Sequence, residues 1–300
     1  MIALSTMPPY TATTIVATTT ILLLTTTSAS PNPRPFNKIY AFGDSYTDTG
    51  NTASASGPNA FTYVSNLPYG STFFHHPTNR YSDGRLAVFD DALIWVGEIG
   101  ANDYAYTVGS LVQSKTIQQL SIRNVNGFLE ALIDKGAKYM VVEGLMTTGR
   151  LTLSMSLASN SDRDDMGCVA SLNKQSYDHN TILLTKIQDL RRKYLETVII
   201  YANYWNAYRS VIKNAPKLGF KELYKVCCGS SGAPYNFDLL VTCGSQSSSS
   251  CQNPSQYINW DGVHLTEAMN KVVAESFLKG GFTHPPFGSL MSRKQYSRLA

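Results

Sequence analysis

The sequence has few charged residues and no concentration of positive charge. Only 15% of its 300 residues are Asp, Glu, Lys or Arg, and the net charge is +4. No cluster of Lys and Arg interleaved with aromatic residues occurs, although such clusters are the usual footprint of nucleic-acid binding. The composition therefore gives no support for a nucleic-acid partner. With 43% hydrophobic residues, the chain can instead bury the core of a globular domain.

The sequence also lacks the patterns of a zinc site and of a transmembrane helix. Its five cysteines include no Cys-x-x-Cys pair and no His/Cys cluster. Nothing in it requires a metal, nucleotide or other cofactor, and we predict none. The apolar stretch within residues 1–30 is interrupted by threonines, so we predict no stable membrane insertion. The sequence gives no indication of protein partners.

Residues 1–30 resemble a secretory signal peptide. Apolar residues occupy positions 15–17 and 21–24, and Ser28-Ala29-Ser30 followed by Pro31 has the small residues of a cleavage site. The usual positive start is missing, and a transit peptide is the alternative, although the segment contains no Arg. We predict a secreted, extracellular protein.

The cysteines fit an oxidising compartment, and we interpret them as structural disulfides. Cys243 and Cys251 flank a Ser-rich loop and could pair across it. Cys168 could then pair with Cys227 or Cys228, which leaves one thiol over.

Strand-like and helix-like segments alternate along the chain, and this order predicts an α/β fold. Apolar runs over residues 39–42, 92–97, 138–142 and 197–201 are typical of buried strands. Helical spacing of apolar residues occurs over 116–135, 171–193, 204–212 and 266–278. Strands separated by helices favour a three-layer α/β/α sandwich with a mainly parallel sheet, whose catalytic groups lie at the carboxyl ends of the strands. We interpret His179, in the second helix, as exposed.

The segment IYAFGDSYTDTGN over residues 39–51 places Ser45 at a turn after a strand. A hydroxyl there can point out of the end of the sheet, as nucleophiles of serine hydrolases do, although the segment is not a Gly-x-Ser-x-Gly elbow. The alternative is a helix cap in which Asp44 or Ser45 accepts a backbone N–H.

The segment WDGVHLTEA over residues 260–268 supplies a possible base. Asp261 precedes His264 by three residues at the entry to a helix, so the carboxylate can hold one ring nitrogen and leave the other for Ser45. Asn102 follows a strand-like run and could donate an amide N–H to an oxyanion. Taken alone, these residues also fit an N-cap aspartate, a surface histidine and a turn asparagine.

The motifs GDSYTDTGN, GEIGANDY at 97–104 and DGVHLTEA at 261–268 resemble, in this order, blocks of the plant GDSL esterase/lipase family of SGNH hydrolases. Further similar segments are PYGSTFF at 68–74, RYSDGR at 80–85 and CCG at 227–229. The resemblance covers residues 36–285 and leaves 286–300 as a C-terminal tail. It implies Ser45 as nucleophile, His264 as base, Asp261 as its orienting partner, and Asn102 with the Ser45 N–H as oxyanion donors.

The sequence departs from this family pattern between Arg85 and Ala92, where only six residues stand. The family carries there a helix, a strand and a glycine whose N–H joins the oxyanion hole. The chain reads as if an internal segment were missing near 89–91, and we expect the loss of a central strand, its crossover and one donor. Arg150 also stands where the family has a cysteine. We therefore predict a secreted serine esterase or lipase acting on a small ester or lipid, with a catalytically impaired relative as the alternative.

Overall fold

The computed structural model describes Phe36 and residues 39–48, 63–84, 93–230, 232, 234–279 and 281–296. All of them belong to one compact unit, Arg34–Ala300. The predicted signal peptide, residues 1–30, lies outside the described residues. No described helix is both long enough and apolar enough to span a lipid bilayer.

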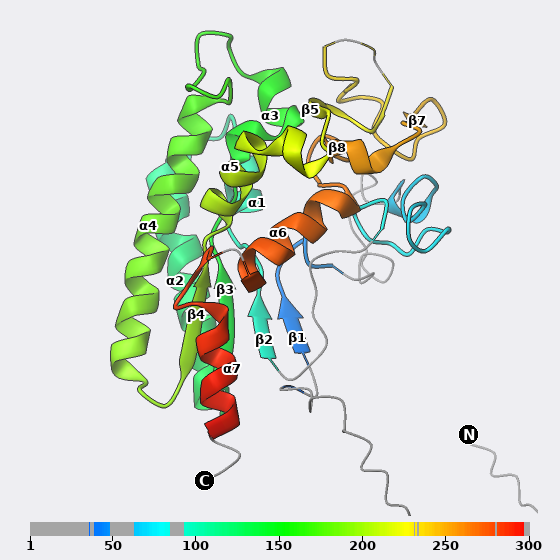
Figure 1. Cartoon of the computed structure of the whole chain (residues 1–300). Coiled ribbons are helices and arrows are strands. Elements are labelled where there is room, and N and C mark those ends of the chain that lie inside the picture. The colour runs from blue at the N-terminus through cyan, green and yellow to red at the C-terminus, as the bar shows by residue number, and fades with distance from the viewer. Residues whose placement is uncertain are drawn as a thin grey trace, which may run out of the picture. The chain divides into compact units, whose positions relative to one another are not determined.

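Five strands form the central sheet, in the spatial order β1, β2, β3, β4, β9 (Figure 1). They are β1 (Ile39–Phe42), β2 (Leu93–Val96), β3 (Tyr139–Glu143), β4 (Val198–Ala202) and β9 (Thr283–His284). The first four pair in parallel, and β9 joins β4 antiparallel. The four predicted strands are therefore confirmed to within one residue at each end.

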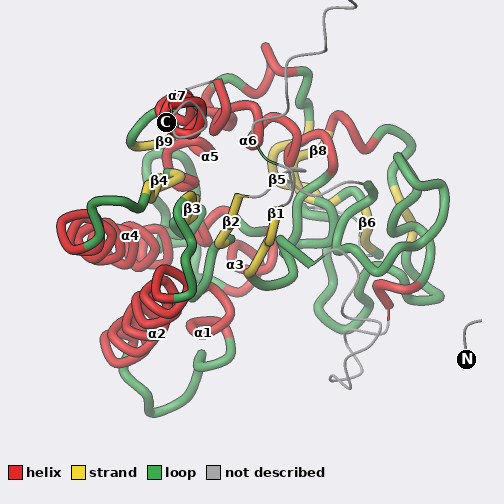
Figure 2. The backbone as a smooth tube through the Cα atoms, turned by 90° about the horizontal axis from the view of Figure 1, so that it is seen from below, coloured by secondary structure: helices red, strands yellow, loops and turns green. Residues whose placement is uncertain are grey.

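Helices cover both faces of this sheet, which makes the predicted three-layer α/β/α sandwich (Figures 1 and 2). One face carries α2 (Ser114–Asp134) and α4 (Ala170–Lys193). The other carries α5 (Tyr204–Lys213), α6 (Glu267–Lys279) and α7 (Phe287–Tyr296). The shorter helices are α1 (Ala101–Ala105), α3 (Thr152–Leu157), η3 (Thr148–Arg150), η4 (Ala215–Leu218) and η5 (Pro254–Gln256).

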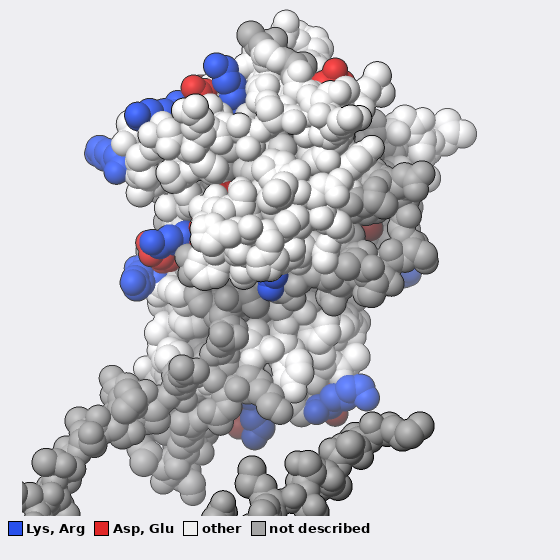
Figure 3. All heavy atoms as spheres, turned by 90° about the vertical axis from the view of Figure 1, so that its right-hand side faces the viewer, with Lys and Arg blue, Asp and Glu red and all other residues white. Residues whose placement is uncertain are grey.

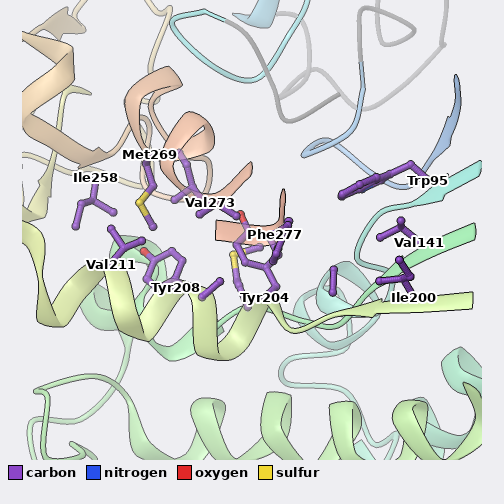
Figure 4. Packing of buried hydrophobic residues seen from close by; sticks show 14 of the residues in the cluster. Trp95, Val141, Ile200, Tyr204, Tyr208, Val211, Ile258, Met269, Val273 and Phe277 are labelled. Carbon is purple, nitrogen blue, oxygen red and sulfur yellow. The ribbon is translucent and has the colours of Figure 1, made fainter. Parts of the chain in front are cut away.

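The alternation of side chains along the strands divides the core into two layers. Trp95, Val141 and Ile200 point to the α5/α6 side, where they pack with the core residues drawn in Figure 4. Their strand neighbours, among them Val96 and Ile199, pack against α2 and α4 instead. Because successive side chains of a strand face opposite sides, continuous apolar strands are required when both faces are covered.

The sheet has no gap at its centre. Phe42 pairs directly with Val96, so β1 and β2 are neighbours. The strand that follows the shortened interval pairs with β1 itself, so a strand missing from that interval would lie beyond β1 and not at the centre of the sheet. Among the described residues, β1 is the outermost strand, and its Tyr40 and Phe42 are 54% and 37% exposed. This edge is the place where a further strand would fit.

A second group of short strands lies beside the sandwich and is held by two disulfides. Its strands are β5 (Glu222–Val226), β6 (Cys228–Gly229), β7 (Ser249–Ser250) and β8 (Tyr257–Asn259). The bridges join Cys227 to Cys251 and Cys228 to Cys243, and Cys168 is free. The predicted pairings are thus wrong, although one thiol is left over as expected. Antiparallel pairing of β6 with β7 brings Cys251 to Cys227, which the sequence spacing alone did not indicate.

Figure 3 shows the side of the molecule on which this disulfide-held region lies, and charged side chains are sparse there. The Lys and Arg side chains in this view are scattered rather than gathered in one patch. The sequence accounts for this, because residues 226–266 contain no Lys or Arg and only two acidic residues.

Two further expectations differ from the structure. His179 is fully buried, not exposed. It lies one turn before Leu183 on the buried side of α4, and this i, i+4 relationship was the signal that would have placed it correctly.

The segment expected as a tail, 286–300, contains α7, whose Leu290 is fully buried in the core, so the fold extends beyond residue 285.

Candidate active site

Ser45 lies in the tight turn that follows β1, at the carboxyl end of the parallel strands. The Asp44 carbonyl accepts the N–H groups of Thr47 (3.0 Å) and Asp48 (2.9 Å), and the Asp44 carboxylate accepts the Tyr46 N–H (3.0 Å). Asp44 therefore makes the local cap that was the alternative interpretation of this motif. The Ser45 hydroxyl is not used in that cap, and it points at another part of the chain.

His264 meets Ser45 from the far end of the sequence. Its Nε2 lies 2.7 Å from Ser45 Oγ, and its Nδ1 lies 2.8 Å from Asp261 Oδ2. Asp261 Oδ1 accepts the backbone N–H of His264 (2.8 Å), which fixes the carboxylate under the ring. The three predicted side chains thus form one hydrogen-bonded series.

Asp261 is held as a carboxylate by its surroundings. Burial alone would raise its pKa, but the charge of His264, the bonds from His264 and the Tyr69 hydroxyl (2.7 Å) lower the pKa to about 2. A permanent negative charge beside Nδ1 keeps the proton on that nitrogen, which leaves Nε2 as an acceptor.

Aromatic rings enclose the imidazole, and the sequence analysis did not name them as site residues. The Tyr81 ring lies 4.5 Å from the His264 ring between centroids, and the Tyr46 ring lies at 5.3 Å. Tyr46 also donates its hydroxyl to the carbonyl of Val263. The only sequence feature that pointed to these tyrosines was their position within the motifs GDSYTDTGN and RYSDGR.

The RYSDGR motif also supports the helix that begins just after His264. Asp83 is 1% exposed, and its Oδ1 accepts the backbone N–H of Glu267 (2.7 Å), the first residue of α6. A carboxylate at this position satisfies an otherwise unpaired N–H and the positive end of the helix dipole. The loop of this motif thus lies beside the site, whereas His75 and His76 are exposed.

Asn102 lies in the first turn of α1, not at a strand end as expected. Its Nδ2 donates to Asp44 Oδ2 at 2.8 Å, which ties it to the residue that precedes Ser45. An amide nitrogen carries two hydrogens, so the second N–H is available for a substrate oxygen. The fourth predicted residue is therefore brought to the turn that holds Ser45.

Arg150 and Cys168 lie together away from this site. Arg150 is 1% exposed, and its Nη1 is 3.4 Å from Cys168 Sγ and donates to the Met166 carbonyl at 3.1 Å. The free cysteine thus touches the arginine that stands where the family pattern has a cysteine.

A three-layer sandwich with Ser, His and Asp hydrogen-bonded in series at the carboxyl ends of its strands has the arrangement found in serine hydrolases. Comparison with known proteins gives the family. The model of the family GDSL-like Lipase/Acylhydrolase matches residues 87–277, a range that includes Asn102, Asp261 and His264 but not Ser45.

Curated relatives agree with this match. GDSL esterase/lipase At3g48460 from Arabidopsis thaliana is 45% identical, over 87% of this chain and 90% of the relative. GDSL esterase/lipase At1g28640 from the same plant is 31% identical, over 88% of this chain and 92% of the relative. The chain belongs to the GDSL esterase/lipase family and is, as a member, a carboxylic-ester hydrolase.

The first of these comparisons spans 345 residues, whereas this chain has 300, so the relative carries residues without a counterpart here.

Proposed function

We propose that the protein is a secreted serine esterase that cleaves carboxylic esters through Ser45, His264 and Asp261. The observation that carries the proposal is the 2.7 Å distance between His264 Nε2 and Ser45 Oγ. A serine hydroxyl becomes an effective nucleophile only when a base in hydrogen-bond contact can take its proton.

The reaction follows from the hydrogen bonds of the three side chains. His264 Nε2 takes the proton from Ser45 Oγ while the oxygen attacks the ester carbonyl. The imidazolium is stabilised by Asp261, and it returns the proton to the leaving alcohol. Water activated by the same nitrogen then hydrolyses the acyl-enzyme and regenerates Ser45.

The negative oxygen of each tetrahedral intermediate is assigned to two donors, the Ser45 backbone N–H and the Asn102 amide. Removal of one such donor typically costs about 10²–10³-fold in turnover. The glycine donor of the family pattern was expected to be missing here. We therefore expect turnover below that of an ester hydrolase with three donors.

Secretion is supported by the sequence of residues 1–30 and by two disulfides, which persist in oxidising compartments. The substrate class is an ester of a small molecule or a lipid. We assign no cofactor to the reaction, because each step is carried by a named side chain or backbone group.

A fluorophosphonate probe tests the nucleophile. The wild type is expected to be labelled covalently, Ser45→Ala is expected to lose all labelling, and Ser292→Ala, a serine on α7, serves as the matched control. Hydrolysis of p-nitrophenyl acetate should follow the same order. Labelling that persists in Ser45→Ala would exclude this assignment.

A catalytically impaired protein with a binding role is the second candidate. It is favoured by the residues that the compared relative has and this chain lacks, and by the exposed β1 edge. Its expected signature is cooperative thermal unfolding together with no labelling and no ester hydrolysis.

A further inference from the structure

Glu98 is a fully buried acid that the mechanism above does not use. It is 0% exposed, and neither of its carboxyl oxygens is paired with a donor among the described residues. A buried carboxylate without donors is costly, so an acid in this position requires an explanation.

The register of the sheet places Glu98 beside Asp44. Phe42 pairs with Val96, and the Gly97 N–H donates to the Phe42 carbonyl at 2.6 Å. Two residues beyond this pair, Asp44 and Glu98 leave the ends of adjacent strands, which places their carboxyl groups next to each other.

Two carboxyl groups in contact cannot both be ionised at low cost, so one of them carries a proton. Burial, followed by the charge of Asp44, the bond to it and the charge of Glu143, holds the pKa of Glu98 well above its usual range. Asp44 is less buried, and its two carboxyl oxygens already accept the N–H groups of Tyr46 and Asn102. The shared proton therefore belongs to Glu98.

Asp44 connects this buried pair to the reacting groups. Its Oδ2 accepts the Asn102 amide at 2.8 Å, and its Oδ1 accepts the Tyr46 N–H at 3.0 Å, next to Ser45. The direction in which the Asn102 amide points thus depends on the orientation of one carboxylate.

We propose that Glu98 is a positioning residue whose protonated carboxyl donates to Asp44 and thereby fixes the Asn102 amide as an oxyanion donor. The proposal rests on the function proposed above. Neutral Glu98 has a second effect, because it keeps a further negative charge away from the place where the oxyanion forms. The titratable groups that face the pair are Glu143, Tyr46 and Tyr204, all of which are acids.

Two substitutions separate the proton-donor role from simple space filling. Glu98→Gln keeps the shape and a donor N–H, and is expected to retain kcat within about threefold. Glu98→Leu fills the space without a donor, and is expected to lower kcat roughly 10–10²-fold with KM within about twofold, because it loosens one oxyanion donor. Glu196→Leu, at an exposed position, is the control.

A double-mutant cycle identifies the residue through which Glu98 acts. In an Asn102→Ala background, Glu98→Leu is expected to cause no further loss, since the amide that it positions is absent. Losses that multiply in the double mutant would overturn the proposal, as would a Glu98→Gln variant that is as slow as Glu98→Leu.

A readout independent of turnover separates this proposal from the proposed function. The wild type minus Glu98→Gln infrared difference spectrum at neutral pH should contain the C=O stretch of a protonated carboxylic acid. The Asn102 side-chain amide protons should exchange slowly with solvent in the wild type and Glu98→Gln, and rapidly in Glu98→Leu. An inactive wild type with both signals would refute the esterase proposal alone, whereas an ionised Glu98 or unchanged exchange would refute the positioning role.

Discussion

His264 Nε2 lies 2.7 Å from Ser45 Oγ, although 219 positions separate the two residues in the sequence. The contact forms because β1 ends at the same edge of the sheet as the loop that leads into α6. Tyr46 reinforces it from the next position, where its hydroxyl donates to the Val263 carbonyl. The nucleophile turn and the histidine loop are thus bonded twice, once through the reacting atoms and once beside them.

Replacement of Asp261 by asparagine should abolish most activity while it preserves the local turn. The amide oxygen can still accept the backbone N–H groups of Val263 and His264, but an N–H₂ group would face Nδ1 and favour the wrong tautomer. We expect kcat to fall about 10³–10⁴-fold with little change in melting temperature. Asp238→Asn, which alters a similar turn aspartate elsewhere, is the control. Near-normal kcat in Asp261→Asn would contradict the proposed role.

Tyr69→Phe should weaken the folded state through Asp261. The Tyr69 hydroxyl donates to the buried carboxylate, and its loss should reduce the free energy of unfolding by about 1.5–3 kcal/mol at pH 7. The Asp261 pKa is lowered in the folded state, so its contribution is present above its unfolded value of 3.8 and is lost as pH falls toward 2. The deficit of the variant in urea unfolding should therefore shrink at pH 3. Tyr106→Phe, which is 72% exposed, should show no deficit at either pH.

Glu143 should make the protein less stable as pH rises from 4.5 to 7. The residue is 7% exposed, and its carboxyl accepts the Trp95 indole N–H at 2.7 Å. Burial raises its pKa to about 7 despite that bond, with the Asp44 charge acting in the same direction as burial. Because the folded state binds this proton more tightly, the stabilisation is complete below 4.5 and is lost through 7.

The size of this loss is roughly 2–4 kcal/mol at about 1.4 kcal/mol per pKa unit. Glu143→Gln keeps the indole bond and should reduce the difference in urea unfolding between pH 5 and pH 8. Glu98, with a raised pKa of its own, leaves a residual slope of the same sign. An equal pH dependence in wild type and variant would argue against a buried, protonating Glu143.

Removal of the bridge between Cys228 and Cys243 should affect both stability and activity. The bridge closes a loop with a sequence separation of 15, for which the loss of chain entropy corresponds to about 3 kcal/mol. The Cys228 N–H also donates to the Trp260 carbonyl at 2.8 Å, immediately before Asp261. The double variant Cys228→Ser/Cys243→Ser should therefore melt at a lower temperature and show reduced kcat.

Cys168→Ser is the matched control, since this thiol is free. It should change the melting temperature much less than the double variant. If Cys168→Ser melted at as low a temperature as the double variant, the loss of stability would come from the introduced serines and not from the broken bridge.

Arg150→Met should cost little, although the residue is completely buried. Its Nε and Nη2 have no hydrogen-bond partner among the described residues, and its guanidinium lies 4.1 Å from the centroid of the Tyr224 ring. Replacement of a poorly compensated buried charge by an apolar side chain of similar volume is often neutral or stabilising. We expect the free energy of unfolding to stay within about 1 kcal/mol of wild type or to rise. A loss above about 3 kcal/mol would mean that the guanidinium has a strong partner.

The sequence by itself determined the elements and one local pair. Apolar runs and helical spacing located β1 to β4 within one residue and α2, α4, α5 and α6 within two, because periodicity reflects burial that both faces of the sheet require. The Asp261–His264 contact was also predictable, since three positions on one turn place the two side chains next to each other.

Only the tertiary structure decided which distant groups meet. The partners of Cys227 and Cys228 depend on how β6 pairs with β7, and the tyrosines around His264 come from loops whose paths carry no periodic signal. The contact between Glu98 and Asp44 depends on the register of β1 against β2. Periodicity along a chain reports which side of an element is buried, whereas contacts between elements are set by strand order and register, and these arise only when the whole sheet is assembled.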